Sequence, residues 1–464
     1  MIARASSRRK EHGLSRRERN HVPMNTRHGG FLRIGIAAAA MLLGAGATAQ
    51  MQMANHLIDG ITGPAFTLTA KAAYLSTPEG NSIYFWGYAG GDGPAQYCGP
   101  TLIVNQGQAV TVTLRNELPV PTSIVFPGHT GVTAAGGSPG LLTREAPAPA
   151  GGTAGTVTYS FTASRPGTFL YNSGTRPDLQ IEMGLVGALI VRPAGFNPMM
   201  PATWRAYTTG DTAFDQEFLF LLTDMDDTIH SEVELQVLIG GPIVADTAAY
   251  FPVYWFMNGR AGPDTMAPAG AAYLPHQPYD CMPMMRPGEK LLMRVIGAGR
   301  DPHPLHHHGN NALVIARDGS PLRAPSGPGG GAGADLAYSV FTIPATPGGT
   351  TDAIFTWTGR GLGWDIYGHA PGDPLAPYED PEDHGKPFPA VLPTLQDMTF
   401  GQMYSGSPFL GTLGSLPPGE GGFNASAGFM YMWHSHAEKE IVNNDIFPGG
   451  MMTMLMIEPW HMMP

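Results

Sequence analysis

The sequence predicts an all-β fold of two Greek-key β-sandwich domains, and three observations carry this prediction. The 464 residues include 62 Gly and 44 Pro, and only 14% are charged. No long amphipathic helical run occurs, whereas segments such as Thr101–Leu114 alternate apolar and polar residues as strands do. A chain of this kind suits many short strands joined by turns, and its length suffices for two or three domains.

Residues 1–49 have the pattern of a leader with a signal peptide. Basic residues precede the apolar run Ile34–Ala47, and residues 47–49 provide a small-x-small cleavage site. Either Met24 is the true start or the leader is long. The apolar run is too short to span a bilayer comfortably, and no other stretch is apolar enough. We therefore expect a periplasmic or extracellular protein whose mature chain has no membrane span.

Removal of the leader leaves an acidic chain. Residues 1–49 hold nine Lys/Arg and two Asp/Glu, so 17 basic and 35 acidic residues remain and the net charge is −18. Such a chain repels nucleic acid and anionic membrane surfaces, which excludes both as expected partners. Cations and neutral molecules remain, and charge alone does not choose between them.

The strand pattern divides the remaining chain into two blocks. Residues 50–198 form the first predicted domain, which ends in the Gly- and Pro-containing linker Ala194–Ala202. Residues 199–464 form the second, which ends in the strand candidate Gly450–Glu458. Within it, residues 361–425 are rich in Gly, Pro and acidic residues, and we expect a long loop-rich insertion there.

The two cysteines, Cys98 and Cys281, are predicted to form a disulfide. A pair of cysteines in an oxidising compartment usually does so, and each stands shortly before a strand-like segment in a different block. The alternative is two buried free thiols, since neither has a histidine beside it or a metal-ligand spacing.

Two histidine clusters are candidates for a metal site. The first is HPLHHH at residues 303–308, and the second is HSH at residues 434–436. Because residues i and i+2 of a strand share a face, each cluster points two imidazoles one way, namely His306 with His308 and His434 with His436. If the two strands are neighbours, the four imidazoles converge. Imidazole suits copper, zinc, iron and nickel, and copper has the highest affinity among divalent ions.

Around these clusters the sequence resembles the multicopper oxidases over nearly all of the mature chain. The family's third copper motif, HPxHxHG, is matched fully by residues 303–309, and the fourth, HCH, becomes HSH at 434–436. The second, GTxxYHSH, becomes GTFLYNSG at 167–174, followed as in the family by Gln and by GLVG. The first, TSIHWHG, becomes TSIVFPG at 122–128. The resemblance implies cupredoxin-like sandwich domains.

Half of the family's cluster ligands are absent. Eight histidines hold a three-copper cluster in the family, and four of their positions are here Val125, Pro127, Asn172 and Gly174. Val, Pro and Gly cannot ligate, and an amide is a poor copper ligand. Nearby His129 is out of register by two residues. The remaining ligands, sufficient for one metal ion or at most two, are His306, His308, His434 and His436.

The position of the family's electron-transfer copper is altered as well. His303 holds the first histidine position, but Ser435 replaces the cysteine, and the second histidine falls near Glu440. A blue copper site needs a cysteine thiolate, so we expect none even with Met451 or Met452 as an axial thioether. His303 is therefore a fifth candidate metal residue, beside the other four. If it lies apart from them, as its three-residue offset from His306 suggests, it is a remnant and not a ligand.

The resemblance thus implies a metal-binding protein that holds copper, in fewer ions than a four-copper laccase, with zinc as the alternative metal. Two functions stay open: a copper-dependent oxidoreductase with a reduced histidine site and an unknown substrate, or a non-catalytic copper-handling or scaffold protein. The motif distribution is similar to that of the two-domain laccases, which implies a homotrimer, although the loss of first-domain ligands removes the metal reason for one.

The mature chain is also rich in methionine. Thioethers bind Cu(I), but methionine is equally an ordinary core residue. In the final strand we expect alternate methionines to face the core.

Overall fold

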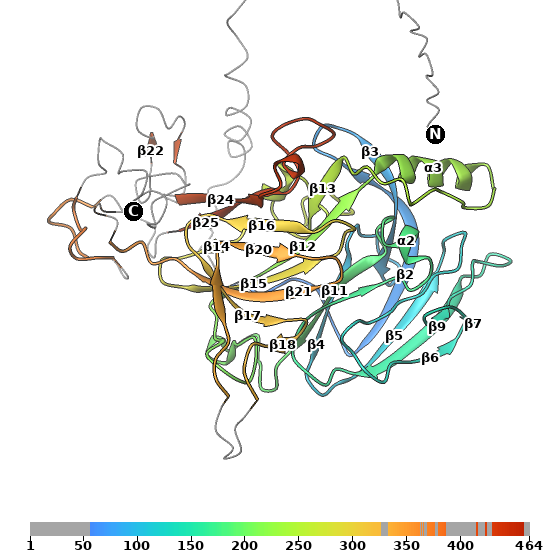
Figure 1. Ribbon diagram of the computed structural model, residues 1–464, viewed down its shortest axis with the longest axis horizontal. Helices are drawn as coiled ribbons and strands as arrows, with labels where there is room; N and C mark the ends of the chain where they lie inside the picture. The colour runs from blue at the N-terminus through green and yellow to red at the C-terminus, as the bar shows by residue number, and fades with distance from the viewer. Residues whose placement is uncertain are drawn as a thin grey trace, which may run out of the picture. The chain divides into compact units, whose positions relative to one another are not determined.

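Strands make up most of the regular structure in the computed structural model (Figure 1). The structure describes residues 56–325, 333–361, 363, 365, 369–375, 379–386, 414–415, 423–424 and 429–458. The predicted leader and much of the predicted insertion lie outside the described residues. The all-β prediction is confirmed for the part of the chain that the structure describes.

The first sandwich consists of two sheets whose alternating apolar residues meet face to face. One sheet has the strand order β3-β2-β5-β9-β6, with bounds Ser82–Gly90, Ala65–Ser76, Ala109–Asn116, Gly155–Thr162 and Thr133–Gly136. The other has the order β1-β4-β11-β10, with bounds Ile61–Thr62, Gly99–Asn105, Val186–Arg192 and Gly167–Asn172. Leu68 of β2 and Leu102 of β4 are fully buried in the shared core. A short pair, β7 (Ser138–Pro139) and β8 (Arg144–Glu145), lies beside it.

The second sandwich is built in the same way from later strands. One sheet has the order β13-β12-β15-β21-β17-β18, with β19 also paired to β17; the bounds are Tyr254–Met257, Gln216–Met225, Lys290–Gly297, Thr350–Thr356, Ala312–Arg317, Ser320–Pro321 and, for β19, Tyr338–Val340. The facing sheet has the order β14-β25-β24-β16-β20, with bounds Met284–Met285, Met452–Ile457, Phe429–Ser435, His303–His307 and Thr342–Ala345. Phe220 and Trp433 meet in the core, with ring centroids 5.8 Å apart.

The remaining elements are short. The strands β22 (Gly414–Ser415) and β23 (Phe423–Asn424) pair with each other. The other described elements are α2 (Pro177–Gln180), α3 (Asp227–Leu238) and the 3-10 turns η1 (Pro201–Thr203), η2 (Asp264–Met266) and η3 (Glu438–Glu440).

Helix α3 is a 12-residue element that the sequence pattern did not predict. It begins after Asp226, whose Oδ1 accepts a hydrogen bond from the Thr228 backbone N–H at 3.0 Å. Ile229 and Val233, one helical turn apart, pack into the core of the first sandwich. This apolar stripe is too narrow to stand out from the sequence. The predicted domain boundary at 198/199 stays a prediction, and α3 shows that the first core uses residues from beyond it.

A buried ion cluster joins the two sandwiches. Glu217 of β12 accepts hydrogen bonds from Arg192 of β11 and from Arg294 of β15, the latter at 2.6 Å. Burial would raise the pKa of Glu217, but the two guanidinium groups outweigh it and lower the pKa to about 2. The carboxylate is therefore ionised and pairs with both cations, and its pair with Arg192 crosses the junction between the sandwiches.

Candidate metal centre

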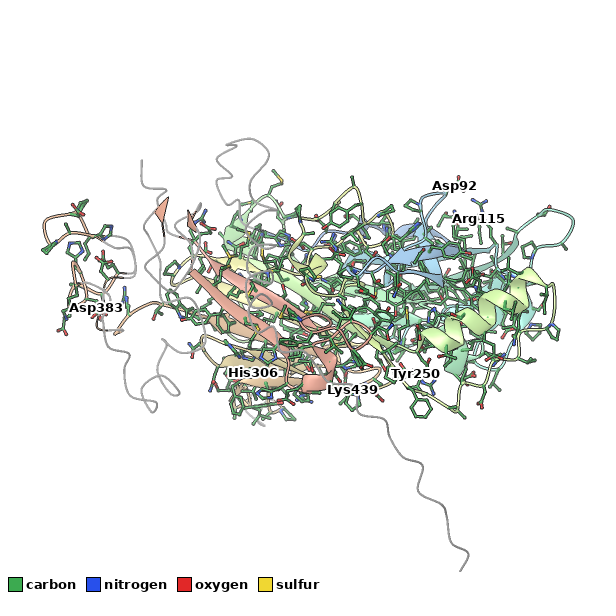
Figure 2. All side chains as sticks on the ribbon, turned by 90° about the horizontal axis from the view of Figure 1, so that it is seen from above. Asp92, Arg115, Tyr250, His306, Asp383 and Lys439 are labelled. Carbon is green, nitrogen blue, oxygen red and sulfur yellow. The ribbon has the colours of Figure 1, made fainter. Side chains whose placement is uncertain are left out.

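Four histidines from two neighbouring strands converge on the outer face of the second sandwich. Strands β16 and β24 are antiparallel, and His306 lies opposite His434 in their register. The centroids of the five closest ring pairs among the four lie 4.7 to 5.6 Å apart. We call His306, His308, His434 and His436 the histidine quartet; His306 is labelled in Figure 2.

Backbone carbonyl groups orient two of these imidazoles. The Nδ1 atom of His306 lies 2.8 Å from the Phe341 carbonyl oxygen, and that of His434 lies 2.7 Å from the Ser435 carbonyl oxygen. An Nδ1–H that donates to a carbonyl leaves Nε2 with its lone pair, the arrangement found in metal-ligating histidines. The Nε2 atoms of His434 and His308 are 3.2 Å apart, so they share either a proton or a metal ion.

Two imidazoles of the quartet are in the neutral form that can bind a cation. Burial, and then the neighbouring imidazole of His308, lower the pKa of His306 from 6.5 to about 4. Burial also lowers the pKa of His434. Both rings are therefore neutral at neutral pH, as ligation requires. The His436 side chain is 53% exposed, so the quartet is open to solvent.

His303 lies on the opposite face of β16, apart from the quartet. Alternation along the strand buries His303, Leu305 and His307 and turns His306 outward. The His303 Nδ1 atom is 3.1 Å from Glu440 Oε2, and its Nε2 atom is 3.3 Å from Asp224 Oδ1. Burial would lower the pKa of His303, but the two carboxylates outweigh it and raise the pKa to about 9. The ring is therefore protonated at neutral pH.

Ser435 completes this inner arrangement. Its hydroxyl donates a hydrogen bond to Glu440 Oε2 at 2.5 Å. The other carboxylate, Asp224, accepts hydrogen bonds from the Tyr250 hydroxyl at 2.6 Å and the Arg300 backbone N–H at 2.7 Å. Where the family motif places a cysteine thiolate and a second histidine, the chain has an ion cluster, which we call the inner ion cluster: Asp224, His303, Ser435 and Glu440.

Comparison with known proteins supports the resemblance to the multicopper oxidases. Residues 77–195, most of the first sandwich, match the family model described as multicopper oxidase. The chain carries a multicopper oxidase domain. It is also 25% identical over 252 residues to a probable nitrite reductase-hydroxylamine oxidoreductase fusion protein of Kuenenia stuttgartiensis; the match covers 53% of this chain and only 25% of that protein.

Two solved structures share the fold. The blue copper oxidase from Nitrosomonas europaea superposes with a TM-score of 0.52 at 17% identity, covering 84% of this chain and 85% of that one. The multicopper oxidase mgLAC superposes with a TM-score of 0.50 at 17% identity, covering 85% of each chain. These similarities, together with the two sandwiches, establish a cupredoxin-like β-sandwich fold.

The segment that matches the multicopper oxidase model is also the part of the chain in which the ligand positions hold other residues. Val125 and Asn172 face each other across an isolated bridge, with the Val125 backbone N–H donating to the Asn172 carbonyl at 2.8 Å. A Cβ atom added to Gly174 would lie 2.7 Å from the Val125 side chain. The fold thus brings the positions of Val125, Asn172 and Gly174 together, and the Val125 side chain fills the space between them. Pro127 is exposed.

His129 does not replace the missing ligands. Its ring packs beside Phe161 and Phe169, with centroids 4.8 and 4.5 Å away. Burial, and then the charge of Arg165, lower the pKa of His129 to about 4. The ring is thus neutral and held within an aromatic contact, in keeping with its shifted register.

Methionines of β24 and β25 share the outer face of the sheet with the quartet. Met452 of β25 lies opposite His434, and Met454 lies opposite Met432 in the same register. Residues opposite each other in a ladder share a face, so these thioethers lie beside the imidazoles. We expected alternate methionines of the segment 450–458 to face the core; Met451 does so, but the three methionines of β25 do not. Thr453, Leu455 and Ile457 occupy the buried positions, and the methionines alternate with them at half-buried ones.

The predicted disulfide is not formed, and this prediction was wrong for the structure. Both cysteines are free and buried. The Cys98 thiol lies 3.9 Å from the Thr223 hydroxyl, whereas the Cys281 thiol donates to the Met257 carbonyl at 2.9 Å. The two side chains belong to different core clusters, and burial raises the pKa of each thiol.

Sequence reasoning missed two groups of polar residues. Asp224 ends a strand almost 80 positions before His303, and only the sheet topology brings them together. The second group lies in the predicted insertion, where the sequence pattern indicated no metal site: Asp365, His369, Glu379 and His384. Within the described residues, we find no helix with the length and apolar character needed to cross a bilayer.

Proposed function

We propose that the chain is a copper-binding protein whose histidine quartet holds one copper ion, or at most two, and that it acts as a copper-dependent oxidoreductase without a blue copper site. The observation that carries the proposal is the convergence of four imidazoles, two of them with Nδ1 tied to a carbonyl. Four histidines saturate one ion, whereas a three-copper cluster needs about twice as many ligands.

The neighbouring thioethers support copper over zinc. Met432 and Met452 share the outer face with His434. Thioether sulfur is a soft ligand that favours Cu(I), whereas imidazole binds both oxidation states. A site with both ligand types suits an ion that changes its oxidation state, as copper does. Zinc does not change its oxidation state.

Substrate oxidation would have to occur at the quartet itself. The inner ion cluster supplies no thiolate, so no second copper centre would pass electrons to the quartet. The exposure of His436 leaves the quartet accessible to a small reductant. Because the curated relative is described as a nitrite reductase fusion, nitrite and oxygen are both tested as electron acceptors.

Elemental analysis of the purified, copper-loaded chain tests the metal site. We expect about one copper per chain, lost in His434→Ala/His436→Ala and retained in His129→Ala/His276→Ala, which removes as many imidazoles outside the quartet. Circular dichroism checks that the β fold is kept in each variant. Equal copper in both variants would refute the site.

Turnover distinguishes the two functions left open by the sequence. Oxygen or nitrite consumption with a small reductant, abolished in the His434/His436 variant, would support the oxidoreductase. Stoichiometric copper with no consumption of either acceptor would instead support a non-catalytic copper-handling or scaffold protein.

Secretion and assembly belong to the same proposal. Residues 1–49 are proposed to direct the chain to the periplasm or outside the cell. Fractionation of cells that express the full chain tests this proposal.

A homotrimer is proposed from the family resemblance. The exposed ring of Phe341, 6.0 Å from that of His306, offers a surface for a neighbouring subunit to cover. Light scattering should give three times the chain mass; a single-chain mass would overturn the trimer alone.

A further inference from the structure

A second group of metal-ligating side chains lies in the insertion, outside the histidine quartet. It follows β21 and occupies the loop from Asp365 to Lys386, in which the described residues form turns and no helix or strand. Asp383, labelled in Figure 2, belongs to this loop. Four residues point their ligand atoms at one another here: Asp365, His369, Glu379 and His384.

The four ligand atoms gather around one small space, and the shortest distances between them suit a single ion. One nitrogen or oxygen from each residue lies within 4.8 Å of all the others. The His369 Nδ1 atom is 3.3 Å from Asp365 Oδ2 and 3.3 Å from Glu379 Oε1, and His384 Nδ1 is 2.7 Å from the same Glu379 oxygen. Ligand atoms of a tetrahedral zinc ion, each about 2.0 to 2.2 Å from the metal, have separations of this order.

Burial makes the charge of this group significant. The Asp365 side chain is fully buried and that of Glu379 is 2% exposed. With neutral imidazoles the four side chains carry a charge of −2. Buried charges are costly unless they are paired or coordinate a metal, and one divalent cation neutralises this set.

Hydrogen bonds join the two ends of the loop at the cluster. The Asp365 backbone N–H donates to the Lys386 carbonyl at 2.9 Å, and the Gly385 N–H donates to Asp365 Oδ2 at 2.9 Å. The Gly363 N–H donates to Asp383 Oδ1 at 3.0 Å. The oxygen of Asp365 that faces His369 is therefore held by the backbone of the opposite end, an outer contact of the kind that orients metal ligands.

We propose that Asp365, His369, Glu379 and His384 form a structural zinc site that organises this loop and is independent of the quartet. Two imidazoles and two carboxylates form a closed four-coordinate set, as structural zinc sites do. The hard carboxylate oxygens and the lack of a thioether in the set separate it from the Met-flanked quartet and disfavour Cu(I).

Zinc titration of the full chain tests this site separately from the quartet. In the His434→Ala/His436→Ala background, after removal of metal with a chelator, we expect one zinc per chain by elemental analysis. Adding His369→Gln/His384→Gln should remove that zinc. The matched control Glu382→Gln, which neutralises an exposed carboxylate of the same loop, should retain it. No zinc in the starting background, or equal zinc with the glutamine pair, would overturn the proposal whatever the quartet binds.

A second variant and readout guard against misfolding. Asp365→Asn/Glu379→Gln keeps the shape of the side chains and removes their charge. Zinc should slow proteolysis within the loop of the unsubstituted chain at least about tenfold and leave the rate for this variant unchanged. Equal protection by zinc in both proteins would contradict the site. So would the absence of protection in the unsubstituted chain, which would mean that protonated histidines alone hold the loop.

Discussion

The two faces of strand β16 carry histidines that differ in charge: one imidazole is neutral and the other is protonated. On the outer face, His306 is neutral because burial and neighbouring imidazoles lower its pKa to about 4. On the inner face, three residues earlier, His303 is protonated because Asp224 and Glu440 raise its pKa to about 9. One strand thus presents a neutral imidazole, our proposed metal ligand, on one side and a cation to two carboxylates on the other.

The difference shows what replaces a metal in a buried site. Loss of the thiolate at position 435 would leave His303 buried, and an unpartnered buried imidazole is costly. Glu440, near which the resemblance places the second family histidine, and Asp224 supply hydrogen-bond partners to both of its nitrogens. The protonated imidazole then satisfies the site without copper. On the outer face the carboxylate beside the quartet, Glu438, is largely exposed and lies 3.4 Å from His436 Nδ1.

The largest expected effect comes from rebuilding the inner site. Ser435→Cys/Glu440→His would bring a thiolate and a second imidazole to the inner face, since the carboxylate of Glu440 contacts His303 and the Ser435 hydroxyl contacts that carboxylate. Copper loading of this variant should give the intense visible absorption of a cysteinate–Cu(II) bond. The unsubstituted chain and Glu440→His alone should remain without it. An intense blue band in the unsubstituted protein would contradict our assignment of the inner face.

A smaller effect separates metal binding from stability. His303→Gln leaves two buried carboxylates without their cation and should lower the free energy of unfolding by about 3 to 5 kcal/mol, measured by denaturant titration. Its copper content should not change. His306→Gln, on the other face of the same strand, should lower the copper content and cost much less stability. A loss of copper in His303→Gln at an unchanged fold would place His303 among the ligands and contradict the comparison.

The inner face also predicts a pH dependence on the alkaline side. The pKa of His303 is about 9 in the folded chain and 6.5 ordinarily, so the folded state binds the proton more tightly. The stabilisation, about 3 kcal/mol at about 1.4 kcal/mol per pKa unit, is fully present below pH 6.5 and lost as pH rises to about 9. Unfolding titrations between these pH values should show the decline, and it should be absent in His303→Gln. A parallel decline in both would assign it elsewhere.

Strand periodicity predicted much of this geometry. The two-residue spacing within 306–308 and within 434–436 put each pair on one face, and the three-residue offset put His303 on the other. Periodicity could not identify Asp224, because β12 reaches His303 only through its parallel pairing with β15, a contact between segments far apart in the sequence. The cysteine pair failed for the same reason: position before a strand gives no distance between two side chains.

The smallest effect tests the hydroxyl that stands in the cysteine position. Ser435→Ala removes the donor to Glu440 Oε2, a hydrogen bond of 2.5 Å to a charged group. Such bonds contribute about 1.5 to 3 kcal/mol, but His303 remains as a partner for the same oxygen, so we expect about 1 kcal/mol of lost stability. The pKa of His303 should rise slightly, because Glu440 then has one competing donor fewer, and this moves the alkaline decline to higher pH. Thermal unfolding at pH 7 and pH 9 measures both effects. A loss as large as that of His303→Gln would mean that Ser435, rather than the protonated imidazole, is the main partner of the buried carboxylate.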